Sequence, residues 1–230
     1  IFGRPVVVGG DDLTAVVRAQ DALDFVTRFS AAFEAATAAE DAIDGQMTAS
    51  GGAAFVRRRH PFRLAYGLCE ALADEAKAVG RRRRQGSGSA GSLVMFDRAT
   101  ASVTDGESPQ RSARMGPYRA GGAGAEAHPH LDTLRELAWQ LRKPELPRGR
   151  IRELVELLER APESGEAERS WARLREVQEA RGSKAWKGLL RMWSALGGRD
   201  TSPVVEREGR AAATRAEASI LERLDKEQEK

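Results

Sequence analysis

The stretch that decides the fold lies near the start of the chain and reads Val6-Val7-Val8-Gly9-Gly10-Asp11-Asp12-Leu13-Thr14-Ala15-Val16-Val17. Two apolar runs rich in β-branched residues flank four residues that favour a tight turn, which predicts a β-hairpin with acidic residues at its tip. Gly9 and Gly10 provide a turn that side chains would obstruct, and they leave room for phosphates to approach the backbone.

Asp11 and Asp12 are consecutive, so their carboxylates leave the strand on opposite sides. Mg²⁺ bound to nucleotide phosphates requires a few hard oxygen ligands, with waters completing its shell. This chemistry favours Asp11 and Asp12 as metal ligands. A Gly-Gly-Asp-Asp sequence also makes a good solvated turn, and the tetrapeptide alone would favour that simpler interpretation.

Length and composition indicate a globular protein of one or two domains. The chain has 230 residues, of which 41% are hydrophobic and 31% charged, and its formal charge is only +3. Binding of nucleic acid would therefore need a local basic patch. The single cysteine, Cys69, excludes an internal disulfide and fits a reducing cytoplasm, where we expect the protein to reside. No apolar run approaches the ~20 residues that span a membrane.

The hairpin is followed by elements that alternate between helix and strand. Apolar residues at helical spacing between Ala22 and Ala36 predict a helix that packs on a sheet. The stretch from Met47 to Val56 is a predicted strand of small residues, crossed closely by a helix or a ligand. A helix then begins at Pro61 and ends at Gly80, and Leu93 to Phe96 is the last strand.

This order is that of the latter part of a palm domain. We therefore predict an α+β fold in which residues 1–98 form a partial ferredoxin-like palm domain, an antiparallel sheet with helices on one face. Because Ile1 opens directly on a strand, we expect this domain to be incomplete at its amino end.

Two side chains of the second helix have a simple and a functional interpretation. Cys69 falls on the apolar face and has no base near it in sequence, so we predict a core residue, not a nucleophile. Lys77 lies near the predicted helix end, where it pairs with Asp74 or contacts a phosphate. The arginines of the predicted loop Arg81 to Ser92 either contact RNA phosphates or are solvated.

The remainder of the chain is predicted to be largely helical. Residues 99–130 form a loop or linker, in which His128 and His130 lack the partners of a zinc site. Residues 131–198 form a small helical bundle whose tryptophans lie in its core. The charged tail 199–230 is a surface helix, a partner-binding helix or partly disordered.

These motifs, taken in order, resemble one family. The Gly-Gly-Asp-Asp hairpin, the strand Ser50-Gly51-Gly52, the helix opening at His60-Pro61-Phe62, the helix end Ala73 to Arg81 and the strand Ser92 to Phe96 resemble the second palm domain of the large subunit of type III CRISPR effector complexes. Gly116-Pro117-Tyr118 and the run Leu146 to Leu154 match less specifically. The resemblance covers about Val6 to Leu158.

The resemblance implies a nucleotidyltransferase that binds two ATP molecules with Mg²⁺ or Mn²⁺. Such palms join ATP 3′ to 5′ and close it into cyclic oligoadenylate, a second messenger of antiviral defence, when the complex holds guide RNA and target RNA. The metal lowers the pKa of the ribose 3′-hydroxyl and neutralises charge as pyrophosphate leaves. The expected partners are ATP, the RNAs and the other effector subunits, without a membrane.

The resemblance also assigns roles to individual residues. Asp11 and Asp12 are catalytic and hold the metal, and the nucleotide contacts are Gly9, Gly10, Ser50 and Lys77. The family's palm begins with a further strand that carries another acidic ligand, and no such strand precedes Ile1. We therefore expect this chain alone to catalyse no reaction.

Two alternatives remain. A diguanylate cyclase of the GGDEF group shares the palm and the ending Ala76 to Arg81, but there an acid and a phenylalanine would stand where this chain has Leu13 and Thr14. A non-catalytic palm scaffold in an RNA-guided complex is the second alternative, in which the acids are vestigial. A generic α+β domain with a chance acidic turn requires several ordered motifs to coincide.

Overall fold

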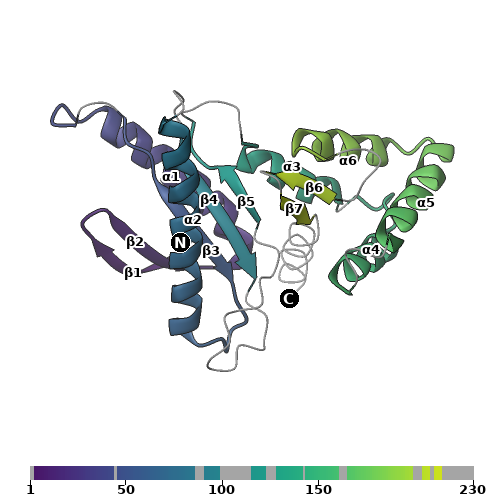
Figure 1. The fold of residues 1–230 in the computed structure, drawn as a ribbon, viewed down its shortest axis with the longest axis horizontal. Helices are drawn as coiled ribbons and strands as arrows, with labels where there is room; N and C mark the ends of the chain where they lie inside the picture. The colour runs from purple at the N-terminus through teal and green to yellow at the C-terminus, as the bar shows by residue number, and fades with distance from the viewer. Residues whose placement is uncertain are drawn as a thin grey trace.

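A computed structural model describes residues 3–43, 46–85, 91–98, 115–122, 128–141, 143–160, 165–198, 204–207 and 210–213. Strands and helices alternate in the first half of the chain, and helices follow (Figure 1). The elements are β1 (Gly3–Gly9), β2 (Asp12–Val17), the 3₁₀ turn η1 (Ala19–Asp21), α1 (Ala22–Ala38), β3 (Ser50–Phe55), α2 (Phe62–Gln85), β4 (Leu93–Arg98), β5 (Met115–Arg119), α3 (Leu131–Leu141), α4 (Arg148–Arg160), α5 (Glu166–Ala180), α6 (Lys184–Ala195), β6 (Val204–Arg207) and β7 (Arg210–Ala213). The α+β class is confirmed.

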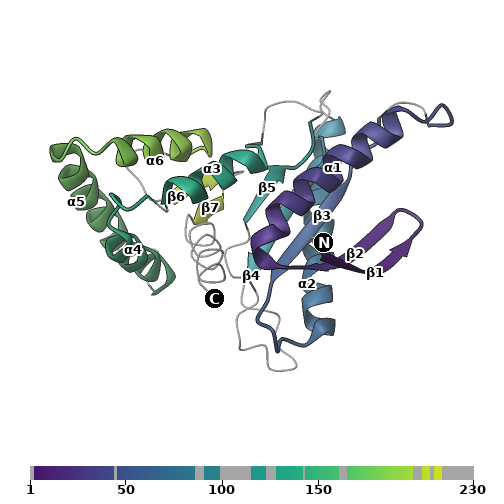
Figure 2. The same ribbon diagram turned by 180° about the vertical axis from the view of Figure 1, so that it is seen from behind.

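The predicted hairpin is present as β1 and β2. The two strands pair antiparallel, and the last pair joins Gly9 to Asp12, so the turn itself consists of Gly10 and Asp11. Gly10 has φ of 60°, a conformation that the primed hairpin turns require and that favours glycine. The hairpin forms a sheet of its own and projects from the body of the protein (Figures 1 and 2).

A second sheet has the order β3-β4-β5, and it differs from the predicted antiparallel sheet. β3 pairs with β4 in parallel, because the helix α2 joins them as a crossover connection. β5 pairs with β4 antiparallel. Among the described residues, β3 is therefore an edge strand, and no strand pairing joins it to the hairpin.

Helices cover both faces of this sheet, whereas the sequence predicts helices on one face. Leu93 and Met95 of β4 pack in a cluster with the α2 residues Leu72 and Ala76. The alternate residues of β4 lie in a second cluster, which includes residues of α1 and α3. Figure 1 accordingly shows α2 in front of the sheet. Figure 2, seen from the opposite side, shows α1 in front of it.

The crossing of α2 over β3 depends on the small residues predicted for this strand. A Cβ atom at Gly52 would lie 2.7 Å from Cβ of Leu72 and 2.8 Å from the backbone nitrogen of Ala73, and still closer to the carbonyl oxygen of Cys69. The helix backbone thus lies directly against the strand. The prediction of a strand crossed closely by a helix is confirmed.

The buried face of α1 is not the one that its apolar residues predict. Leu23, Ser30, Glu34 and Thr37 are buried, and the Glu34 carboxylate accepts a 3.0 Å hydrogen bond from the Ser92 N–H at the start of β4. Phe25, Phe29 and Phe33 instead stack on one another with centroids 6.2 Å apart, and Phe29 is 37% exposed. Of the predicted apolar stripe, Ala22 and Val26 pack against the main apolar cluster, which contains Leu23.

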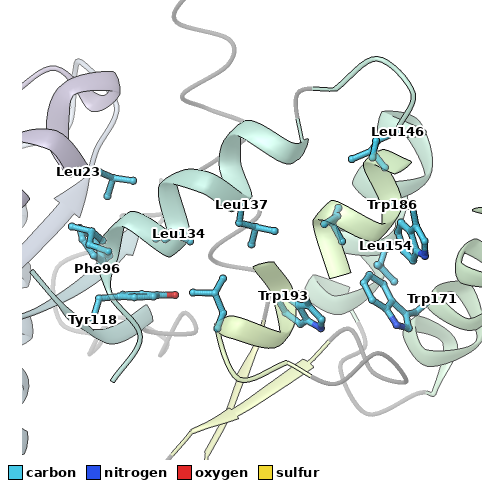
Figure 3. Packing of buried hydrophobic residues seen from close by; sticks show 14 of the residues in the cluster. Leu23, Phe96, Tyr118, Leu134, Leu137, Leu146, Leu154, Trp171, Trp186 and Trp193 are labelled. Carbon is cyan, nitrogen blue, oxygen red and sulfur yellow. The ribbon is translucent and has the colours of Figure 1, made fainter. Parts of the chain in front are cut away.

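One apolar cluster runs from the sheet into the helices that follow it. It contains Phe96 and Tyr118 of the sheet, Leu134 and Leu137 of α3, and the tryptophans of α5 and α6 (Figure 3). The ring centroids of Trp171 and Trp186 are 5.3 Å apart. The predicted core role of the tryptophans holds for Trp171, Trp186 and Trp193, but Trp139 is 55% exposed.

Three boundaries differ from the sequence-based ones. Helix α2 continues past Gly80 to Gln85, since arginine is a good helix former and Gly80 is buried near Leu93. The predicted linker 99–130 contains β5, which the pairing with β4 stabilises. In the predicted helical or disordered tail, β6 and β7 form a hairpin. Residues 86–90 of the predicted basic loop and 214–230 of the tail lie outside the described residues.

No helix in the described part of the chain is long and apolar enough to cross a membrane.

The close approach at Gly52 predicts a large and specific loss of stability. Gly52→Ala should lower the free energy of unfolding by about 1–3 kcal/mol or more, because the new methyl group overlaps helix backbone that cannot move aside. Gly67→Ala is the matched control, since Gly67 lies within α2 with open space around it and alanine favours the helix by about 1 kcal/mol. Urea denaturation of both variants provides the measurement. A Gly52→Ala protein as stable as the unaltered chain would contradict the described packing.

Cys69 should react slowly with alkylating reagents. Burial raises the pKa of its thiol, a hydrogen bond with the Ala54 backbone opposes that shift, and the charge of Glu70 adds to it. A raised pKa lowers the fraction of reactive thiolate at any pH below it. At pH 8 we expect iodoacetamide to modify the folded protein more slowly than the urea-unfolded chain. Equal rates would place the thiol in solvent and contradict its half-buried position.

Candidate functional site

The tip of the β1–β2 hairpin presents its acids to solvent. Asp11 and Asp12 are both exposed, and no hydrogen bond or ion pair engages either carboxylate within the described parts of the chain. A Cβ atom added at Gly9 or Gly10 would meet nothing within 4 Å. The tip therefore offers two charged oxygen donors beside open space.

These donors fit a magnesium ion that shares its shell with a nucleotide. Within the described ranges, no group of three or more His, Cys, Asp or Glu side chains gathers in a way that could hold a metal. A cage made wholly of protein ligands is therefore not offered by this part of the chain. Mg²⁺, however, is usually bound through one or two carboxylates while substrate phosphates and waters supply the other ligands. Asp11 and Asp12 meet that requirement.

Helix α2 carries further polar groups on its exposed side. The pKa of the Tyr66 hydroxyl is raised, first by the hydrogen bond that it donates to Glu70 and by the charge of Glu70, then by burial and by the charge of Asp12. The charge of Asp12 is the smallest of these four causes, whereas Tyr66 and Glu70 interact directly on the exposed side of α2.

Lys77 lies on the same face of α2 but further along it. Tyr66 and Lys77 are eleven residues apart, which corresponds to about 16 Å along a helix and nearly the same side of it. Lys77 is exposed, and it lies two turns before the end of α2 instead of in its last turn. The described geometry therefore does not bring Lys77 next to the acidic tip.

Ser50 lies at the same end of the sheet as the turn of α2 that carries Lys77, not at the acidic tip of the hairpin. It is the exposed first residue of β3 and pairs with Leu93. Gly52, two residues further along β3, lies against residues 69–73 of α2, and the helix and the strand run in opposite directions. Ser50 consequently lies toward the turn of α2 that carries Lys77. The predicted site residues form two groups, with the acids and glycines in one and Ser50 and Lys77 in the other.

Sequence reasoning misses Tyr66 and Glu70 and misplaces Phe62. The helical spacing of apolar residues predicts Phe62 on the apolar face of α2, yet it is 50% exposed. Phe62, Tyr66 and Glu70 recur every four residues, which puts them on one side of a helix. That spacing is the available signal for this exposed side of α2.

Comparison with known proteins agrees with the motifs of the hairpin, β3 and α2. Residues 2–85 match the family model described as Cas10/Cmr2, second palm domain. Searches of curated proteins and of solved structures found no match. The matched segment contains the acidic tip, Ser50, Lys77 and the whole of α2. Residues 2–85 of this chain are therefore similar to the second palm domain of Cas10/Cmr2.

Proposed function

We propose that this palm binds Mg–ATP at its hairpin tip and takes part in the synthesis of cyclic oligoadenylate within the effector complex. The observation that carries the proposal is the exposed pair Asp11 and Asp12 beside the open space at Gly9 and Gly10. Solvated carboxylates with room for phosphates suit a metal–nucleotide complex better than a purely structural turn.

Each residue of the tip has a distinct task in this proposal. Asp11 and Asp12 provide the charged oxygen ligands, and the glycines let the triphosphate approach the backbone. Mg²⁺ or Mn²⁺, when bound, supplies Lewis acidity at the attacking 3′-hydroxyl and neutralises charge on the leaving pyrophosphate. The protein contributes chiefly the positioning of the reactants and the electrostatic environment.

Lys77 and Ser50 are assigned to a second nucleotide. The reaction joins two ATP molecules, and these residues lie about 16 Å along α2 from Tyr66, on which the charge of Asp12 acts. The Lys77 ammonium is an exposed cation suited to a phosphate. If each group serves its own nucleotide, the acidic tip and the pair Ser50 and Lys77 need not converge on one metal.

Two other functions make different demands on the nucleotide. A diguanylate cyclase would use GTP, and a scaffold would bind no nucleotide. In the large subunit of a type III effector complex, ATP is converted only when guide RNA and target RNA are present, so RNA and the other effector subunits are the proposed partners. Binding of Mg–ATP is the step that separates the three functions.

The double substitution Asp11→Asn and Asp12→Asn should weaken Mg-dependent ATP binding at least about tenfold. Loss of the charged ligands removes interactions that are each comparable to charge-assisted bonds of about 1.5–3 kcal/mol. The urea midpoint should not change, because both side chains are exposed. Isothermal titration calorimetry with and without Mg²⁺ measures the effect.

Asp41→Asn provides the matched control, since Asp41 is an exposed acid in the turn after α1. It should leave ATP affinity unchanged. Titration with GTP completes the experiment, and tighter binding of GTP than of ATP would favour the diguanylate cyclase. ATP affinity that is insensitive to both Mg²⁺ and the double substitution would exclude the proposed role of the tip.

Lys77→Gln should affect only the weaker of two ATP-binding events. We expect a loss of about two- to fivefold, because an exposed charge pair contributes at most about 1 kcal/mol. Lys187→Gln, at an exposed lysine of α6, is the control. The titration should be repeated at two salt concentrations, since screening weakens a phosphate contact. An unchanged second event would remove Lys77 from the site.

A further inference from the structure

We infer that a hollow at the amino end of α6 binds a phosphate group of RNA. The hollow measures about 370 Å³, within the range of small-molecule sites, and its lining consists of Glu145, Gln178, Arg181, Ser183, Lys184 and Ala185. The inference goes beyond Mg–ATP binding at the hairpin tip, because α6 and the hairpin lie toward opposite ends of the molecule in Figures 1 and 2.

Two backbone N–H groups at the start of α6 have no acceptor. The N-cap residue Ser183 accepts a 3.2 Å hydrogen bond from the Trp186 N–H through its hydroxyl, and its carbonyl oxygen accepts one from the Lys187 N–H. In the described parts of the chain, the N–H groups of Lys184 and Ala185 are left without a partner. Both residues line the hollow. Free N–H groups at the positive end of a helix dipole favour a bound anion.

A buried amide in the same hollow gives independent support for a ligand. Gln178 of α5 lines the hollow and is only 1% exposed. Its backbone carbonyl accepts a hydrogen bond from the Ser183 N–H, but its side-chain amide has no hydrogen-bond partner within the described ranges. Buried polar side chains are nearly always hydrogen-bonded in native proteins. A phosphate oxygen in the hollow would accept a hydrogen bond from this amide.

The charges around the hollow also favour an anion. Arg181 and Lys184 are exposed, and neither forms an ion pair with a carboxylate of the described residues. Glu145 is the only acid in the lining, and α6 itself contains no acidic residue. The first turn of a helix disfavours a cation, so the ammonium of Lys184 gains from an anion bound beside it.

The lining suits a phosphate better than an acidic segment of a protein. Protein partners usually bury an apolar centre and leave lysine at the rim of the interface or outside it. None of the exposed large apolar side chains of the described structure belongs to the lining. A phosphate has several oxygens and can accept bonds from N–H groups, an amide, a guanidinium and an ammonium at once. The phosphodiester backbone and a terminal phosphate of RNA share this chemistry.

The experiment measures binding of an oligouridylate of about 16 nucleotides, labelled with fluorescein at its 3′ end, to the full chain by fluorescence anisotropy. Mg²⁺ and ATP are left out. Lys184→Gln should lower the affinity at least about fivefold and the slope of log affinity against log salt by about 0.7, the contribution of one contact to a single strand. Lys187→Gln is the matched control, since Lys187 is an exposed lysine of α6 outside the hollow, and it should lower the affinity less than about twofold.

Two further variants separate the hollow from a general positive charge. Gln178→Met keeps the length of the side chain but removes the amide, and it should weaken binding about two- to tenfold without changing the salt slope. Glu145→Gln removes the one acid of the lining and should strengthen binding about twofold. Urea midpoints show whether each variant is folded. Because Glu145 is exposed, its variant tests the hollow even where Gln178→Met does not fold.

The strand is supplied with and without a 5′-phosphate to identify the group that is bound. Equal losses for the two strands in Lys184→Gln support a backbone phosphate, and a loss confined to the phosphorylated strand supports a terminal one. Equal losses in Lys184→Gln and Lys187→Gln overturn the inference, and so does an unaltered chain that binds neither strand. Competition by polyglutamate as strong as that by unlabelled RNA also overturns it and favours an acidic protein segment.

The hollow and the hairpin tip can fail separately in this experiment. The double substitution Asp11→Asn and Asp12→Asn should leave RNA affinity in the absence of Mg²⁺ unchanged or slightly higher. A chain that binds Mg–ATP but no RNA keeps the proposed function of the tip and loses the phosphate site of α6.

Discussion

The direct contact between the backbone of α2 and Gly52 is the constraint on which the palm segment depends. Because no side chain separates β3 from the helix, α2 lies across both β3 and β4 and buries Leu72 and Ala76 against Leu93 and Met95. The same helix is the crossover that makes β3 and β4 parallel. Its outer face is then turned away from the sheet, and this is the face that carries Tyr66 and Glu70.

Much of this arrangement follows from local sequence. The turn residues and valine runs predict the hairpin, the small residues of β3 predict a close crossing, and Pro61 predicts the helix start. These features are determined by backbone preferences within a few residues. Local backbone preferences do not determine which elements pair with each other. Which strands hydrogen-bond, and which side of α1 is buried, depend on contacts between distant segments, as the Glu34–Ser92 hydrogen bond illustrates. The periodicity of apolar residues therefore cannot predict that Phe29 is partly exposed.

The candidate site shows the same limit. Motifs identify Asp11, Asp12, Ser50 and Lys77, but they give no distances between elements. Once α2 is placed, helix geometry alone separates Lys77 from Tyr66 by about 16 Å, and the charge of Asp12 reaches the Tyr66 end. Tyr66 and Glu70 belong to none of these motifs.

The small number of protein ligands at the tip has a consequence for affinity. Two exposed carboxylates leave most of the Mg²⁺ shell to water and to phosphate oxygens. In the proposed function, metal and nucleotide would then bind as a unit, and by linkage each would raise the affinity of the other by the same factor. Under this constraint the acids contribute to binding any triphosphate, so they cannot by themselves select ATP. Selection of ATP would have to come from groups that contact the base.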